Sequence, residues 1–117
     1  MMAFSRPGGE ASRKARARPI DLDHLARQTM SDRNLEQEVL AMFLQQLGTV
    51  RNSIATADRR ERMRLAHALK GSARGIGAFA LADCAERIED DPSDAALITR
   101  LTGLIVEARD FIAAISR

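Results

Sequence analysis

From residue 20 onward, apolar residues recur at every third or fourth position, and this spacing constrains the fold more than any other feature. Helices place residues three and four apart on one face, whereas half-buried strands need strict alternation of apolar and polar residues. The sequence beyond Ile20 shows no such alternation and no run rich in Val, Ile and Thr bounded by turns. It therefore predicts an all-α fold.

The pattern begins with one short and one long helical segment. We expect the short helix from Leu22 to about Met30, where it lies as a lid over one end of the fold. The long helix starts between Asp32 and Asn34 and spans about 20 residues, or roughly 30 Å. Its apolar stripe consists of Leu35, Val39, Met42, Phe43, Leu47, Val50 and Ile54.

The third helix is expected from about Arg59 to Arg74. Asp58 is suited to cap its first turn, because a carboxylate at this position accepts hydrogen bonds from free backbone amides. Gly75 and Gly77 are expected to end it, because glycine tolerates the left-handed backbone of a helix terminus.

Two more helices complete the pattern. The fourth buries Leu81, Cys84, Ala85 and Ile88 on its inner face. The fifth is expected to begin with Asp91 as its cap and Pro92 in its first position, and to run nearly to residue 117. Four long helices joined by short loops pack most simply as an antiparallel up-and-down four-helix bundle, with the short N-terminal helix as an addition.

Residues 1–19 differ from the rest of the chain in charge and composition. They hold five of the 18 cations against one anion, Glu10, and they contain two prolines and two adjacent glycines. We interpret residues 1–19 as a disordered basic tail and residues 20–117 as one folded domain. Aromatic residues are only 3% of the chain, which leaves few platforms for stacking bases and argues against nucleic-acid binding.

Hydrophobic segments and cysteine content indicate where in the cell the protein is located. No apolar run is long enough to cross a bilayer, and the first residues lack the apolar stretch of a secretory signal. The single cysteine, Cys84, cannot form an internal disulfide and is interpreted as a core residue. These features predict a cytoplasmic protein that does not associate with membranes.

His67 is the candidate reactive residue, because imidazole is the side chain best suited to act as a nucleophile near neutral pH. Positions three and four residues away share its helical face, and they hold Met63, Arg64, Lys70 and Gly71, while a further turn adds Arg74. Three cations around the ring would favour its neutral, nucleophilic form and stabilise a phosphoryl group attached to it. The other histidine, His24, has no second metal ligand near it in the sequence, and we interpret it as a lid or surface residue.

The string from His67 to Ala78, HALKGSARGIGA, followed by Leu81, Cys84 and Glu89, closely resembles the signature of histidine-containing phosphotransfer (HPt) domains. Asp32, Leu35 and Phe43 are similar to the family's pattern ahead of that motif. The resemblance implies a four-helix bundle with an exposed histidine in mid-helix. It makes His67 the phosphoryl acceptor, Lys70 the cation that stabilises the phosphoryl group, and Gly71 the small residue that gives access to the ring.

The function that this resemblance implies is that of a stand-alone intermediate in a bacterial phosphorelay. The protein would accept a phosphoryl group from the aspartyl phosphate of one receiver domain and pass it to the aspartate of another. It would be a carrier with no ATP site of its own, a monomer, and bind no cofactor, with Mg²⁺ supplied by the receiver. Its partners would be receiver domains of hybrid histidine kinases and response regulators, contacted through Met63, Arg64, Ala68, Arg74, Ala78 and Phe79.

Two alternatives remain open at this point. The first is the dimerising phosphoacceptor module of a histidine kinase, although an acidic residue usually follows the histidine there and Ala68 stands in that position. The second is a helical adaptor or nucleic-acid-binding module that acts through the basic tail. Oligomeric state tests the first alternative, and deletion of residues 1–19 tests the second.

Overall fold

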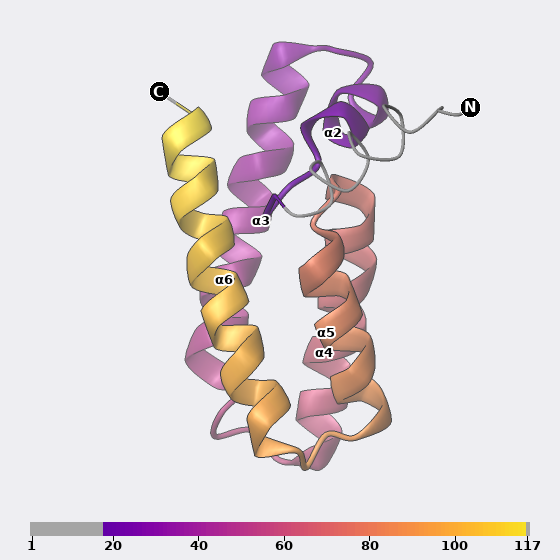
Figure 1. Ribbon diagram of the computed structural model, residues 1–117, viewed down its shortest axis with the longest axis vertical. Coiled ribbons are helices and arrows are strands. Elements are labelled where there is room, and N and C mark those ends of the chain that lie inside the picture. The colour runs from indigo at the N-terminus through magenta and orange to yellow at the C-terminus, as the bar shows by residue number, and fades with distance from the viewer. Residues whose placement is uncertain (1–17, 117) are drawn as a thin grey trace, which may run out of the picture.

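The computed structural model describes residues 18–116, which form five α-helices and no β-strand (Figure 1). The prediction of an all-α fold is confirmed. The helices are α2 (Leu22–Gln28), α3 (Arg33–Ser53), α4 (Arg59–Ile76), α5 (Phe79–Asp90) and α6 (Ala95–Ile115). Residues 1–17 of the predicted tail lie outside the described part of the chain. None of the helices described is both long and apolar enough to span a membrane.

The four longer helices lie side by side along the long axis of the molecule, and the chain reverses direction at each connection between them (Figure 1). Helices α4 and α5 form a hairpin that is shorter than α3 and α6, and α2 lies over its end. The core takes side chains from all five helices. Its largest fully buried members include Leu25, Leu40, Leu47, Ile54, Leu69, Ile88, Leu101, Ile105 and Ile112.

Aspartates begin four of the helices. The carboxylates of Asp21, Asp32, Asp58 and Asp94 each accept a hydrogen bond from a backbone amide in the first turn that follows. The predicted cap at Asp58 is confirmed, but the predicted start of the last helix is wrong. Asp94 caps α6, whereas Asp91 ends α5 and Pro92 lies in the connection between them, because only the Asp94 carboxylate reaches the free amides.

The α4–α5 turn depends on Gly77. Helix α4 continues through Gly75 to Ile76, beyond its expected end, and Gly77 then adopts a left-handed backbone with φ of 94°. A Cβ at Gly77 would lie 3.0 Å from the carbonyl oxygen of Asp21 and 3.3 Å from Cδ2 of His24. Glycine is therefore needed both for the turn and for the close approach of the segment that leads into α2.

His24 packs α2 onto this turn. Its Nε2 lies 3.1 Å from the carbonyl oxygen of Gly75, close to the end of α4, and its ring packs in a T-shaped arrangement with that of Phe79, with centroids 5.2 Å apart. The backbone amide of Asp21 donates to the carbonyl of Gly77 at 2.9 Å beside it. His24 is thus a packing residue of the lid, in line with its interpretation from the sequence.

At the opposite end of the bundle, Arg62 joins two connections. Its guanidinium donates to the carbonyls of Ile54 and Ala55 after α3, at 3.0 and 2.8 Å, and to the carbonyl of Pro92 before α6, at 3.0 Å. One side chain therefore satisfies carbonyl groups from both loops and fixes them to α4.

The apolar stripe predicted for α3 differs from the buried face of the helix at several positions. Leu40, which the predicted stripe omitted, is buried together with Phe43, Leu47, Val50 and Ile54. In contrast, Leu35 is 37% exposed and Met42 72% exposed, and Val39 is only partly buried. The side chains of Val39 and Met42 instead line an open groove between α3 and α4.

Candidate functional site

His67 lies in the middle of α4, and 72% of its side chain is exposed. The helix turns Ala66, Leu69 and Ala73 toward the core, so His67 is directed away from it. Helix α4 continues unbroken for more than two turns on either side, so its backbone hydrogen bonds hold the Cα atom of His67 in place.

A carboxylate from the neighbouring helix holds one nitrogen of the ring. Oε2 of Glu89, on α5, lies 2.8 Å from Nδ1 of His67, and Oε1 of the same residue lies 2.5 Å from Nζ of Lys70. The hydrogen bond from Lys70, opposed by partial burial and assisted by His67, keeps the pKa of Glu89 below its usual range. Glu89 is therefore ionised near neutral pH.

This contact decides which nitrogen of His67 can react. An ionised carboxylate can only accept hydrogen bonds, so Nδ1 of His67 must carry the proton and donate it to Glu89. In the neutral ring the lone pair is then on Nε2, the nitrogen on the far side of the ring from Glu89. The geometry presents Nε2 of an exposed imidazole as a nucleophile.

The basic surroundings predicted for His67 are largely offset by carboxylates. Arg64 forms a two-pronged ion pair with Glu61, with contacts of 2.8 and 2.6 Å. Arg74 pairs with Glu86 of α5 at 2.5 Å. Each of the three predicted cations is therefore paired with a carboxylate, which for Arg64 comes from α4 itself and for Lys70 and Arg74 comes from α5.

Gly71 leaves open space beside the ring. It lies one turn after His67 on the same face, and apart from the adjoining backbone of α4, a Cβ added to it would meet no atom of residues 18–116 within 4 Å. Packing within the chain therefore does not require glycine at this position. The open space is available to a group that approaches the ring from outside.

The residues predicted to contact a partner do not all lie at the surface. Met63 is 40% exposed, and Ala68 is also exposed, so both can be touched from outside. Ala78 is fully buried at the start of α5, so its inclusion in a contact surface was wrong. Phe79 is partly buried, with its ring against His24.

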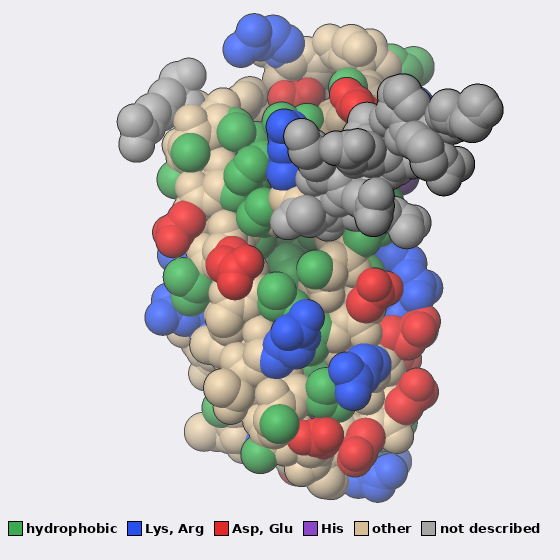
Figure 2. Space-filling model, viewed as in Figure 1, with side chains coloured by type: hydrophobic (Ala, Val, Ile, Leu, Met, Phe, Trp, Pro, Cys, Tyr) green, Lys and Arg blue, Asp and Glu red, His purple; other side chains and the backbone are tan. Residues whose placement is uncertain are grey.

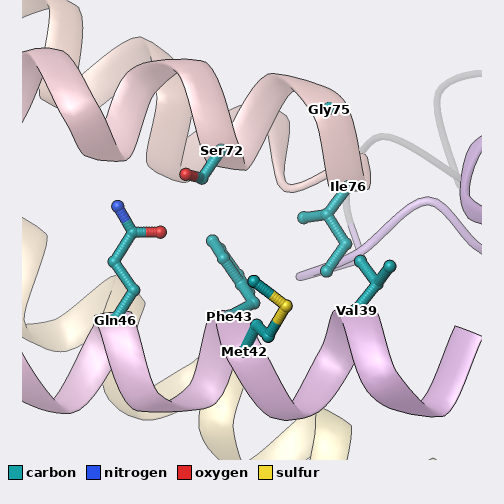
Figure 3. Close-up of a pocket in the computed structure, with 7 residues that line it drawn as sticks. All are labelled: Val39, Met42, Phe43, Gln46, Ser72, Gly75 and Ile76. Carbon is teal, nitrogen blue, oxygen red and sulfur yellow. The ribbon is translucent and has the colours of Figure 1, made fainter.

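A groove of about 430 Å³ opens between α3 and α4 (Figure 3). It lies on the flank of α4 that carries Ser72, one turn beyond the exposed Ala68 that follows His67. Its lining consists of Val39, Met42, Phe43, Gln46, Ser72, Gly75 and Ile76. The close-up shows Met42 and Phe43 directed from α3 toward α4, so the groove has an apolar floor.

A metal site and a reactive cysteine are the other kinds of functional site to consider. Within residues 18–116, no group of three or more His, Cys, Asp or Glu side chains could hold a metal ion. Cys84 is 3% exposed, its thiol faces the carbonyl of Leu97 at 3.6 Å, and burial raises its pKa. Cys84 is therefore a core residue, as its spacing predicted.

An exposed histidine on a rigid helix is suited to a protein that carries a group on the imidazole when, as here within residues 18–116, one ring nitrogen is hydrogen-bonded to a carboxylate and the other has no hydrogen bond. The family model of the Hpt domain matches residues 37–114, and the chain belongs to this family. Hpt domains carry phosphoryl groups on histidine in phosphorelays and interact there with receiver domains. No curated protein and no solved structure matches the chain.

Proposed function

We propose that this protein is a phosphorelay intermediate whose phosphoryl acceptor is His67. It takes the phosphoryl group from the aspartyl phosphate of one receiver domain and gives it to the aspartate of a second. The observation that carries the proposal is the pairing of an exposed Nε2 with an Nδ1 that donates to Glu89. The helices α3 to α6 serve as the antiparallel bundle that holds this pair in place.

In the proposed transfer, the lone pair of Nε2 attacks the phosphorus atom while the bond from phosphorus to the aspartate oxygen breaks. The electron pair of that bond leaves with the aspartate, and the ring becomes a phosphorylated imidazolium with its proton still on Nδ1. Glu89 stabilises the positive charge that develops on the ring. The transition state of such transfers is loose, so positioning and charge provide most of the catalysis.

Lys70 has a double role in this proposal. It lies one turn after His67 and binds Glu89, so it orients the carboxylate that orients the ring. Its ammonium binds the same carboxylate as His67, and in this proposal it also stabilises the negative charge of a phosphoryl group attached to the ring. The receiver supplies the acceptor aspartate and Mg²⁺, and this chain binds no cofactor.

The receiver is proposed to dock over His67 and the α3–α4 groove. Met63, Ala68 and the open space at Gly71 surround the ring, and the apolar floor of the groove lies beside them. Docking of this kind buries a small area, and weak transient complexes have such interfaces. A relay needs rapid exchange of partners, which a small interface permits.

The test is phosphoryl transfer from a phosphorylated receiver domain in Mg²⁺, measured for the wild type, His67→Gln and His24→Gln. We expect acid-labile, alkali-stable phosphate on the wild type and on His24→Gln, but none on His67→Gln. His24→Gln is the matched control because it replaces the only other histidine. A wild type that no receiver in a broad panel can label would contradict the proposal and favour the helical adaptor.

A further inference from the structure

One ridge of α4 carries His67 and most of the helix's exposed cations. Arg60, Arg64, Gly71 and Arg74 are spaced from His67 by three, four or seven positions, so all lie on nearly the same face. The ridge is exposed at each of these positions. A molecule that binds at His67 can therefore also contact other residues of the ridge.

The cations of the ridge differ in whether a carboxylate of the chain offsets their charge. Arg64 pairs with Glu61 and Arg74 with Glu86. Within the described part of the chain, Arg60 has no ion pair, although it is exposed. Glu61 follows Arg60 in the sequence, but both of its carboxylate oxygens accept hydrogen bonds from Arg64. Arg60 therefore contributes the positive charge of the ridge that is not already balanced.

Helix geometry places this charge in line with the reactive ring. Arg60 precedes His67 by almost two full turns, which puts it about 20° around the axis and about 10 Å along it. Its neighbour Arg59 is equally exposed and also lacks an ion pair within residues 18–116, but it lies about 80° around the axis from His67. The two arginines thus have the same charge and lie next to each other at the start of α4, but they differ in direction.

The other side of His67 has the opposite charge. Acidic side chains gather along the outer face of α5 (Figure 2). Among the acidic residues of α5, Glu86 and Glu89 are paired with cations of α4, whereas Asp83 and Asp90 are exposed and have no ion pair within residues 18–116. An acidic partner is therefore repelled on the α5 side and attracted on the side where α4 begins.

We propose that Arg60 is a docking residue that binds a carboxylate on the receiver, about 10 Å from the phosphoryl group, and speeds the association of the two proteins. This inference rests on the proposed function and adds to it a residue that makes the electrostatic contact. Charges at the rim of an interface act mainly on the association rate and its salt dependence. Arg60 therefore raises the second-order rate of transfer and leaves the rate within the bound complex unchanged.

The test compares Arg60→Gln with Arg59→Gln, using a phosphorylated receiver domain that labels the wild type. Rates are measured at about 0.1 M salt, where the Debye length is about 10 Å, and at about 1 M, where it is about 3 Å. We expect Arg60→Gln to lower the second-order rate about threefold at the lower salt concentration, as for one exposed ion pair. Arg59→Gln should change it by less than half as much, and the difference should vanish at the higher concentration.

Three outcomes would overturn the inference. Equal losses in the two variants would show that only net charge matters, and no loss in Arg60→Gln would show that the partner does not contact this residue. A lower rate of transfer under saturating receiver would place Arg60 in the chemical step instead of docking. Failure of the wild type to accept phosphate would refute the proposed function itself. This failure is distinguished from a failure of the Arg60 proposal because it appears before any variant is compared.

Discussion

Replacement of Glu89 by glutamine tests the assignment of Nε2 as the nucleophile. The substitution keeps the size of the side chain but removes its negative charge, and it lets an amide N–H face the ring. The carboxylate then no longer stabilises the cation that forms on His67 during transfer. It also no longer forces the proton onto Nδ1, because an amide can donate as well as accept.

The expected magnitude follows from the geometry. Oε2 of Glu89 lies 2.8 Å from Nδ1, so the centres of the two charges are about 4 Å apart. At that separation the attraction is about 1 kcal/mol in water and about 4 kcal/mol near a protein surface of lower polarity. His67 is 72% exposed, which favours the lower part of this range. We take about 1.4 kcal/mol, which corresponds to about a tenfold slower transfer.

The assay is the single-turnover rate of transfer from a phosphorylated receiver at saturating concentration. Glu86→Gln is the matched control, because Glu86 also lies on α5 and also binds a cation of α4 but does not contact His67. We expect Glu86→Gln to transfer at the wild-type rate. An unchanged rate in Glu89→Gln would refute the reasoning, as would an NMR spectrum of the wild type that places the ring proton on Nε2.

Three further predictions concern stability, measured by urea unfolding with circular dichroism because the chain has no Trp or Tyr. Arg62→Ala should lower the free energy of unfolding by about 3 kcal/mol, since it removes three charge-assisted hydrogen bonds at a partly exposed site, and Arg62→Lys should lower it by about half as much. A loss below about 0.5 kcal/mol in Arg62→Ala would contradict the role of Arg62. Gly77→Ala should lower the free energy of unfolding by about 2 kcal/mol because of the positive φ at this residue and the contact with the Asp21 carbonyl, whereas Gly71→Ala should leave it unchanged or raise it. Similar effects of the two substitutions would refute the role assigned to Gly77 in the turn. Folding lowers the pKa of Glu89, so the contribution of this carboxylate to stability is complete above its unfolded pKa of about 4.3 and is lost as the pH falls through its folded pKa. The difference in free energy of unfolding between the wild type and Glu89→Gln should therefore become smaller from about pH 5 to about pH 3, and a difference that grows would contradict this prediction.

Much of the helical organisation could be predicted from local sequence patterns. The apolar spacing located all five helices, and the cap at Asp58 and the left-handed glycine at residue 77 marked two boundaries correctly. The start of the last helix was missed because two aspartates, Asp91 and Asp94, are both suitable caps. Only the tertiary structure shows which of them has its carboxylate near free amides.

The partner of His67 was missed for a different reason. Glu89 lies 22 residues away in the sequence, where no helical periodicity relates the two positions. The hairpin does relate them, since residues at equal distances from a turn between antiparallel helices lie side by side. The pairs His67–Glu89 and Arg74–Glu86 are both centred on residues 78–80, the turn and the first residues of α5. This symmetry was present in the sequence and could have identified the carboxylates.

The groove could not be predicted from periodicity. Apolar residues at helical spacing indicate a face, but they do not show how much of that face a neighbouring helix covers. Helix α3 buries Leu40 and Phe43 and leaves Met42 exposed, because α4 does not close over the whole apolar side of α3. An exposed methionine and a buried one have the same signature in sequence.

The position of His67 on one exposed ridge of α4 has a consequence for the order of events in the proposed relay. One imidazole on one continuous helix gives one landing place, so the donor receiver and the acceptor receiver must use it in turn. The two receivers therefore compete, and an excess of unphosphorylated acceptor should slow the loading of His67 by its donor. In the cell, the ratio of the two receivers would then set how quickly the signal passes, even if neither affinity changed.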